Sequence, residues 1–431
     1  MSLPLIIPII LTTEKRRKTV LNRLGLSPLP GSIRQYKFLN PNRRPIWVHA
    51  LSVGEVLSAV QLIRGLRTAA IDYDIIFSAS TKTGFDIAKE RLSKDVLDIF
   101  YFPYDLLFSV ERVLRQIDPA LVLIVETDIW PNFLQQMKKR NIPVVLVNAR
   151  LSERSFSGYR RLRFFIRRVL ANLAIVCVQT KRDAQRFRLL GFPSEKLAIT
   201  GNFKFDQPFQ PVDSKVTEGL RDKMNLAQKD KILIAGSTHK GEEVFLSEVF
   251  SKMKSDSTDY RFIVVPRDPK RADSIRRIFE SSGLSASLLR DLSHNNYGRE
   301  IDVLVVDVIG ILRDLYALAD CAFIGGSLVP RGGHNPLEPA VFSKPIIFGP
   351  DMSNFMAVSD MLITSKGAIQ VKDSKNLYTA ATMLMENEEK RRTMGKNAFQ
   401  VFAENKGAVE KTLKIVRAYL PDGPVAVRNN N

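Results

Sequence analysis

Residues 200–213 read TGNFKFDQPFQPVD and interrupt a regular alternation of short apolar runs and longer mixed segments. The apolar runs cover residues 45–51, 74–80, 121–127, 143–150 and 173–180 before this stretch, and residues 231–238, 261–268, 302–308, 321–327 and 345–350 after it. Continuous Val/Ile runs separated by helix-period segments, such as residues 56–68 and 132–140, are typical of parallel sheets that helices cover on both faces. Two such series around a Pro- and Asp-containing linker predict two doubly wound α/β domains that face a cleft.

The length of the chain also favours two domains, because 431 residues exceed what one ordinary core organises. We predict an N-terminal segment over residues 1–30, a first domain over residues 31–206 and a second domain over residues 207–425. With 45% hydrophobic and 25% charged residues, the composition is that of a globular protein and excludes a disordered chain.

The two cysteines indicate a reducing compartment. Cys177 and Cys321 lie in separate apolar runs without C-x-x-C spacing, and the four histidines are scattered. This pattern argues against a disulfide framework and against a zinc site. We therefore expect a cytoplasmic protein without a bound metal.

The net charge of +19 calls for an anionic partner, such as a polyphosphate, nucleic acid or an anionic membrane. Residues 150–170, RLSERSFSGYRRLRFFIRRVL, mix seven arginines with aromatic and aliphatic side chains. Such a basic amphipathic pattern suits anionic headgroups, although a solvated helix face is the alternative. No nucleic-acid-binding signature accompanies the charge, so we predict no nucleic-acid partner.

The N-terminal sequence MSLPLIIPIIL is apolar over about ten residues, whereas crossing a bilayer takes about 20. It contains two prolines and lacks a cleavage site of small residues, which argues against a signal peptide. A shallow membrane anchor, backed by the basic cluster that follows, is one interpretation. A frayed terminus is the other.

Carboxylates follow two strands of the first predicted sheet. In WVHALSVGEV, His49 and Glu55 come directly after a strand, and in LVLIVETDIWPNF, Glu126 and Asp128 follow another. Ligands of open α/β sheets bind at the carboxyl ends of the strands. Glu55 by itself is also explained as a first-turn helix cap. Two carboxylates in one crevice, however, can divide acid and base roles, because proximity raises the proton affinity of one of them.

The second domain has the features of a phosphate and nucleotide binder. IAGSTHKGEE reads as a strand, a turn and a helix start, where Ser237, Thr238 and backbone N–H groups can donate to phosphate oxygens. Arg267 follows a second strand, and Gly310 marks another strand-to-helix turn. Neither a Walker A loop nor a G-x-G-x-x-G fingerprint is present. Helix capping explains any one of these features, but less readily all of them together.

The stretch FIGGSLVPRGGHNPLEPA at residues 323–340 places glycines beside one imidazole, one amide and one carboxylate. Glycines here allow the backbone to approach a ligand closely. Asn335 is predicted to cap a helix whose first position is Pro336. Glu338 then lies in that helix, where its carboxylate can accept two ribose hydroxyls. His334 is either a ligand contact or a satisfied loop residue.

These motifs together resemble the 3-deoxy-D-manno-octulosonic acid (Kdo) transferases. SVGE, VETDIWPN, NARLSERS, TGNFKFD, STHKGEE, VPRDPKR and GGSLVPRGGHNPLEPA occur in the order and spacing of that family, over nearly the whole chain. The resemblance implies the two-domain glycosyltransferase fold GT-B, with two Rossmann-like domains. It also implies an inverting transfer of Kdo from CMP-Kdo to a lipid A precursor (lipid IVA) in lipopolysaccharide biosynthesis, with no metal or other cofactor. The expected location is the cytoplasmic face of the inner membrane, peripheral or N-terminally anchored.

The resemblance also implies roles for individual residues. Glu55 is expected to be the general base, with Glu126 and Lys204 supporting the transition state. The residues expected to bind CMP are Arg267, Asp268, Gly310, Ile311, Leu312, Asn335, Pro336, Leu337 and Glu338. Further candidate contacts to the donor phosphate or sugar are Ser237, Thr238, His239, Gly333 and His334.

The chain departs from the family pattern in three places. Its apolar start is shorter than usual. Where the family commonly reads Gly-Asp-Thr-Met-Gly-Glu-Leu, this chain reads VVDVIGIL, so that Ile311 replaces an acidic residue and only backbone contacts to the donor can persist there. Asp268 stands where a histidine is common.

Three other functions fit parts of the pattern. One is a GT-B glycosyltransferase that uses another nucleotide-sugar donor, such as a UDP-sugar, at the membrane surface. Another is a nucleotide-sugar epimerase, which shares the fold but needs no basic membrane-facing surface. The third is a non-enzymatic membrane or nucleic-acid binder, which would not need carboxylates at two strand ends.

Overall fold

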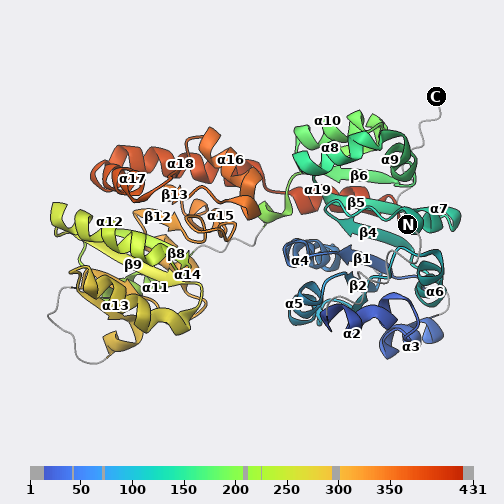
Figure 1. Ribbon diagram of the computed structural model, residues 1–431, viewed down its shortest axis with the longest axis horizontal. Coiled ribbons are helices and arrows are strands. Elements are labelled where there is room, and N and C mark those ends of the chain that lie inside the picture. Colours follow the sequence, from blue (N-terminus) through green and yellow to red (C-terminus); the bar gives the residue numbers. More distant parts are fainter. Residues whose placement is uncertain are drawn as a thin grey trace. The chain divides into compact units, whose positions relative to one another are not determined.

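The protein consists of two compact units, each built on a parallel sheet (Figure 1). The computed structural model describes residues 14–40, 43–69, 73–206, 212–224, 226–293 and 301–420. The first unit comprises residues 1–207 and 405–431, and the second comprises residues 208–404. The predicted fold class is therefore confirmed at the level of the two doubly wound domains.

The first unit contains a parallel sheet with the strand order β3-β2-β1-β4-β5-β6-β7 within the described residues. Its strands are β1 (Ile46–Ala50), β2 (Ile75–Ala79), β3 (Asp98–Tyr101), β4 (Leu121–Val125), β5 (Val144–Ala149), β6 (Ile175–Val178) and β7 (Leu197–Ile199). The chain moves outward from β1 to β3 and then returns to place β4 on the other side of β1. Such a reversal is the topological switch point, where ligands of open α/β sheets bind.

Helices connect the strands of this unit, and local sequence explains where several begin. They are α2 (Glu14–Arg23), α3 (Gly31–Leu39), α4 (Val53–Thr68), α5 (Lys82–Leu92), α6 (Leu107–Ile117), α7 (Pro131–Lys139), α8 (Glu153–Arg161), α9 (Arg163–Leu170), α10 (Lys181–Leu189) and α19 (Ala408–Arg417). The Thr81 hydroxyl caps α5 by accepting a hydrogen bond from the Gly84 amide at 3.1 Å, and α7 begins with a proline, which has no N–H to leave unpaired.

Apolar residues cover both faces of the first sheet. Alternate residues of β1 enter different clusters: Trp47 packs with Phe102 and Phe133 on one face, whereas Val48 packs with residues of α4 on the other. Every residue of β1 is buried, as expected for a parallel strand with helices on both sides. The polar groups of this unit that can meet a ligand are therefore those beyond the strand ends.

The second unit repeats this plan with the strand order β10-β11-β9-β8-β12-β13-β14 among the described residues. Its strands are β8 (Lys231–Thr238), β9 (Tyr260–Pro266), β10 (Ala286–Leu288), β11 (Val303–Val305), β12 (Cys321–Ile324), β13 (Ile346–Phe348) and β14 (Ala368–Gln370). Its helices are α11 (Ser214–Lys223), α12 (Glu242–Asp256), α13 (Ala272–Ser281), α14 (Leu312–Leu318), α15 (Leu337–Ala340), α16 (Met356–Thr364), α17 (Ser374–Glu386) and α18 (Glu388–Glu404). Here the switch point lies between β8 and β12.

The last helix corrects the predicted domain limits, because α19 belongs to the first unit and not to the second. It packs against α4 at Gly65, where a Cβ atom would lie only 2.7 Å from Cγ1 of Val409. The Asp206 carboxylate accepts hydrogen bonds from the amides of Gly407 at 2.6 Å and Val409 at 2.5 Å, which ties the start of α19 to the first unit. Sequence analysis assigned α19 to the second domain because the helix follows that domain directly in the chain.

The described part of the predicted segment over residues 1–30 packs against the first unit. Arg23 donates from Nε to the Phe102 carbonyl at 3.0 Å, and its guanidinium lies 4.1 Å from the ring centroid of Tyr104. Leu29 is buried in the core of the first unit. The apolar run MSLPLIIPIIL lies outside the described residues. No helix in the described part of the chain combines the length and apolar character needed to cross a bilayer.

Four strands escaped sequence analysis, namely β3, β7, β10 and β14. Each lies at an edge of its sheet and has only three or four residues. Some residues of these edge strands are only partly buried, so their segments do not form a continuous Val/Ile run, whereas the more central strands, buried on both faces, do.

Candidate active site

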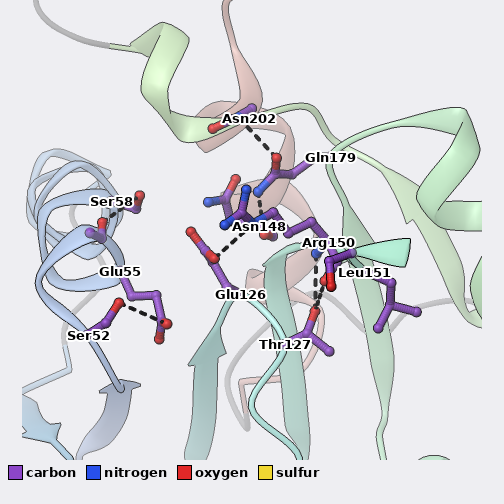
Figure 2. Close-up of polar contacts among 12 residues, drawn as sticks. Ser52, Glu55, Ser58, Glu126, Thr127, Asn148, Arg150, Leu151, Gln179 and Asn202 are labelled. Carbon is purple, nitrogen blue, oxygen red and sulfur yellow. Dashed lines mark hydrogen bonds and ion pairs between the residues drawn. The ribbon is translucent and has the colours of Figure 1, made fainter. Parts of the chain in front are cut away.

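Two carboxylates meet at the switch point of the first unit. Glu55 lies in the first turn of α4, directly after β1, and Glu126 follows the neighbouring strand β4. Figure 2 shows both side chains in the space between the start of α4 and the strand ends. The sequence predicted this proximity from the positions of the two residues after their strands.

Glu55 combines a capping contact with a strongly raised proton affinity. Its carboxylate accepts hydrogen bonds from the Leu51 amide at 2.7 Å and from the Ser52 hydroxyl at 3.0 Å. These bonds favour the ionised form, but burial, then the negative charge of Glu126 and, more weakly, that of Asp128 oppose it. The net result raises the pKa of Glu55 to about 7. Near neutral pH, the group can therefore exchange a proton in either direction.

Glu126 is held in an unusual backbone conformation. Its φ of 62° is in the left-handed region, which a non-glycine residue adopts only when its surroundings impose it. Its amide donates to the Val147 carbonyl at 2.8 Å, and its carboxylate accepts from Nε of Arg150 at 3.2 Å (Figure 2). This conformation directs the chain away from the sheet immediately after β4.

Lys204 lies on the short 3₁₀ turn Phe203–Asp206 of the same unit. Burial lowers the pKa of its ammonium group. The charge of Glu126 partly opposes this effect, and Arg150 adds to it. Lys204, Arg150 and Glu126 therefore interact electrostatically. The structure brings the predicted Lys204 close to the predicted Glu126.

A cluster of three amide side chains holds this turn, and sequence analysis missed it. Gln179 donates from Nε2 to the Asn148 carbonyl at 2.9 Å and accepts from Nδ2 of Asn202 at 3.0 Å. Asn202 in turn accepts from the Lys204 amide at 3.0 Å, and Asn148 accepts through Oδ1 from the Phe203 amide at 3.1 Å. Their positions in the sequence could have indicated this cluster, because all three amides lie at or just after the end of a strand.

His49 and Asp128 bond each other. Nε2 of His49 lies 3.2 Å from Oδ2 of Asp128, and Nδ1 lies 3.0 Å from the Ser78 hydroxyl and carbonyl oxygens. The His49 ring is fully buried and stacks on Phe102 at 3.9 Å between ring centroids. This pair joins the end of β1 to the segment that follows β4.

In the second unit, a buried carboxylate organises the glycine-rich loop. Glu242, in the first turn of α12, accepts hydrogen bonds from the amides of His239, Gly326, Ser327 and Leu328 at 2.7–3.0 Å. Burial raises the pKa of Glu242, and the four backbone donors partly compensate for it. Glu242 therefore joins the segment after β8 to the segment after β12.

The two predicted histidines of this unit bond each other. Nε2 of His239 lies 2.8 Å from Nε2 of His334, and the two rings are nearly coplanar. One ring must donate and the other accept, so at least one is neutral. Burial, then the charges of His239 and Arg267, lower the pKa of His334 to about 4. The pair forms a second link between the two segments that Glu242 joins.

The predicted nucleotide-binding residues gather at one edge of the second sheet. Ser237 and Thr238 end β8, Arg267 follows β9, residues 310–312 follow β11, and residues 325–338 follow β12. These strands are neighbours in the order β11-β9-β8-β12. The Arg267 amide donates to the Thr238 carbonyl at 3.0 Å, which joins two of these strand ends directly.

Asn335 and Glu338 contact each other at this edge. Asn335 accepts from the Leu337 amide at 3.1 Å and donates to Oε1 of Glu338 at 3.5 Å. Burial, the largest cause, raises the pKa of Glu338. Helix α15 begins at Leu337 with Pro336 as its N-cap, one position later than predicted. The Asn335 side chain still caps the turn, as expected.

Two predicted nucleotide contacts have local structural roles. The Asp268 carboxylate caps the 3₁₀ turn Pro269–Arg271 by accepting from the Lys270 amide at 3.1 Å. Gly310 has a φ of 101°, which glycine adopts readily, and Ile311 is the N-cap of α14. The backbone of residues 310–312 forms a strand-to-helix turn, in agreement with the sequence.

Comparison with known proteins identifies the family. The family model described as 3-deoxy-D-manno-octulosonic-acid transferase (kdotransferase) matches residues 20–207. The 3-deoxy-D-manno-octulosonic acid transferase of Haemophilus influenzae is 33% identical over 382 residues, covering 88% of each chain. That of Chlamydia muridarum is 31% identical over 87% of this chain and 86% of its own. This chain belongs to the Kdo transferase family.

Solved structures agree with the GT-B fold of this Kdo transferase family member. MurG of Acinetobacter baumannii matches it with a TM-score of 0.56 at 13% identity, covering 87% of this chain and 99% of that chain. A UDP-GlcNAc 2-epimerase from Neisseria meningitidis matches with a TM-score of 0.57, also at 13% identity, covering 86% and 99%. Identities this low show the fold alone. Family membership makes the chain a glycosyltransferase and decides against an epimerase or a non-enzymatic binder.

The raised pKa of Glu55 yields a testable prediction. The substitution Glu126→Gln removes the nearby negative charge that is the second-largest cause of the shift, so the pKa of Glu55 should fall below about 7. It should remain above the ordinary glutamate value, because burial persists. Asp128→Asn should lower it less. Titration of ¹³C-labelled glutamate carboxyls by NMR measures all three proteins, and an unchanged Glu55 pKa in Glu126→Gln would refute the coupling.

Proposed function

We propose that this Kdo transferase family member moves Kdo from CMP-Kdo to a lipid A precursor, with Glu55 as the general base. The observation that carries the proposal is the buried Glu55 carboxylate, whose pKa of about 7 suits proton transfer at neutral pH. The identity of the sugar as Kdo comes from the names of relatives that are 31–33% identical over most of the chain.

The chemistry follows from the residue types. Glu55 takes the proton of an acceptor hydroxyl as its oxygen forms a bond to the anomeric carbon of Kdo. The bond from that carbon to the phosphate oxygen breaks on the opposite face, and CMP leaves with the electron pair. A single displacement of this kind inverts the configuration. We propose that it proceeds without a metal, since charge can be stabilised by side chains and backbone N–H groups.

Glu126 and Lys204, which interact electrostatically, both support this step. The ammonium group of Lys204 can stabilise negative charge on the reacting groups, and burial strengthens such interactions. The charge of Glu126 keeps the proton affinity of Glu55 high. Glu126 is therefore expected to tune Glu55 as well as to position Lys204 and Arg150.

CMP is proposed to bind the second unit at the sheet edge that carries residues 310–312 and 335–338. Strand-to-helix turns expose backbone N–H groups that suit a phosphate, and the Glu338 carboxylate can accept ribose hydroxyls. The positive charge of Arg267 acts on both His334 and Glu338, which supports a phosphate contact by Arg267. Ser237, Thr238 and Gly333 line the same sheet edge.

Membrane contact is proposed for the surface formed by α8 and α9. Leu162, Phe164 and Phe165 are exposed by 61%, 73% and 52%. Exposed arginines surround them at positions 160, 161, 163 and 167. The structure corrects the apolar set expected from sequence, because Phe156, Ile166, Val169 and Leu170 are buried in the core. Exposed aromatic groups among cations suit an anionic headgroup layer.

The role of Glu55 is tested by Glu55→Gln. A base role predicts normal folding, normal CMP binding and transfer slowed by about 10²–10⁴-fold. In the unsubstituted protein, kcat/KM should rise with pH through about 7 and then level, because the carboxylate is the active form. Single-turnover transfer from CMP-Kdo to tetraacyl lipid A precursor, read by product mass, measures the rate.

The matched control is Glu410→Gln, which alters an exposed first-turn carboxylate of α19 and should leave transfer unchanged. If Glu55 were only a helix cap, Glu55→Gln would stay within about threefold of the unsubstituted rate. That result would leave Glu126 as the next candidate base.

The nucleotide site is tested by Glu338→Ala. Loss of the ribose contacts should weaken CMP binding by about 1–3 kcal/mol in a calorimetric titration. Glu389→Ala, in the exposed first turn of α18, should bind CMP normally. Tighter binding of UDP than of CMP by the unsubstituted protein would instead favour a glycosyltransferase with a UDP-sugar donor.

Membrane contact is tested by co-sedimentation with vesicles. Anionic vesicles should bind the protein more strongly than neutral ones, by about 1 kcal/mol per well-placed cation, and the binding should weaken as salt rises. Replacing Arg160, Arg161 and Arg163 by Gln should remove most of the difference. Equal binding to both vesicle types at low salt would rule out the electrostatic contact.

A further inference from the structure

Arg150 is a cation of the active-site cluster to which neither the sequence motifs nor the mechanism above assigns a substrate contact. It follows β5, and its amide donates to the Thr127 hydroxyl at 3.1 Å (Figure 2). Nε lies 3.2 Å from Oε2 of Glu126. Within the described part of the chain, the two terminal guanidinium nitrogens make no hydrogen bond or ion pair. The side chain is 46% exposed, so a ligand can reach them.

The geometry of the guanidinium indicates which kind of ligand these two terminal nitrogens can bind. A guanidinium presents its donors as a planar fork, which matches the two oxygens of a carboxylate or phosphate. When Nε is engaged by Glu126, the plane of the group is fixed and the terminal nitrogens are directed away from Nε. Arg150 is therefore already oriented by one carboxylate and can bind a second oxyanion.

Asn148, two residues earlier, supplies an independent observation. Its side chain is fully buried, and Oδ1 accepts from the Phe203 amide at 3.1 Å. That bond fixes the orientation of the amide, because a flip would oppose two donors. Nδ2 then has no hydrogen-bond partner among the described residues. An unpaired buried donor is costly, so an oxygen acceptor beside it is favoured.

The charges of the cluster favour an anion. Arg150 and Lys204 both interact with Glu126, and the pKa of Glu55, the other carboxylate of the cluster, is raised to about 7. While Glu55 is protonated, two positive charges therefore stand against the one negative charge of Glu126. Lys204 is half-buried, and both its burial and the charge of Arg150 disfavour its charged form. An added anion would relieve both effects. The same anion would oppose ionisation of Glu55, so its position must favour the cations over that carboxylate.

We propose that Arg150 is a substrate-recognition residue, which binds an anionic oxygen group of a substrate through its terminal nitrogens while Nε holds Glu126. Asn148 assists by donating from Nδ2. This inference rests on the proposed function. Its ligand is an oxyanion that has two possible sources in the reaction: the carboxylate of Kdo, which is a sugar acid, or a phosphate of the lipid acceptor.

The test combines enzyme variants with altered substrates. We expect Arg150→Gln to lower kcat/KM for transfer by about 10–100-fold, the loss of a hydrogen-bonded charge contact. Arg150→Lys, which keeps the charge and loses the fork, should recover part of the loss. Arg188→Gln removes an exposed arginine of α10 and should react like the unsubstituted protein.

The substrate arms identify the source of the anion. The donor arm compares CMP-Kdo with its carboxamide, and the acceptor arm compares lipid acceptors with and without phosphate groups. In the arm that removes the group bound by Arg150, the unsubstituted protein should lose most of its rate and Arg150→Gln should differ from it by less than about threefold. In the other arm, the full difference between the two proteins should persist.

Two outcomes would overturn the inference. One is an Arg150→Gln rate within about threefold of the unsubstituted protein on the natural substrates. The other is an equal loss with every substrate, which would show that Arg150 acts only by orienting Glu126. Asn148 has a φ of 52°, in the left-handed region that Asn and Asp tolerate. Asn148→Asp therefore keeps this conformation and the acceptor for the Phe203 amide, but replaces the donor with a negative charge. A folded Asn148→Asp protein with undiminished affinity would exclude the Asn148 contact.

Failure of the inference and failure of the proposed function are distinguishable. If the unsubstituted protein transferred no Kdo from CMP-Kdo, the proposed function would fail. If it did so and Arg150→Gln matched it, only the inference would fail. Thermal unfolding of each variant separates a loss of contact from a loss of folding.

Discussion

The direction shared by parallel strands is the constraint on which the site depends. In the first sheet, β1 and β4 pair in parallel, so the residues that follow them emerge at the same edge. The chain departs from that edge on opposite sides, because β1 leads toward β2 and β4 leads toward β5. The divergence leaves a space at the strand ends, and Glu55 and Glu126 both enter it. Without the switch in strand order, helices would fill this position.

Burial and like charge together then give Glu55 its chemistry. A carboxylate that accepts two hydrogen bonds would ordinarily have a low pKa, yet burial and Glu126 outweigh those bonds. Glu126 can remain near Glu55 because Arg150 and Lys204 both interact with it and compensate its charge. The site is therefore an arrangement of two carboxylates and two cations in which each group depends on its neighbours.

In the second unit, the main structural requirement is to hold a glycine-rich loop in one conformation. Glycines make the loop permissive, and Gly326, Gly332 and Gly333 all have positive φ angles. Glu242 restricts that freedom by accepting hydrogen bonds from four backbone amides, and the His239–His334 pair adds a second link. Buried polar groups here act as organisers, because each is satisfied only when both segments are in place.

The sequence by itself determined the two parallel sheets, the position of Glu55 and Glu126 after neighbouring strands, and the family. Central strands can be predicted from the sequence because burial on both faces requires continuous apolar runs. Only the tertiary structure decided the short edge strands, the return of α19 to the first unit, and the amides of Asn148, Gln179 and Asn202 that hold Lys204. It also decided the pairing of His49 with Asp128 and of His239 with His334. These contacts join residues far apart in the chain, and one sequence carries no periodicity that marks them.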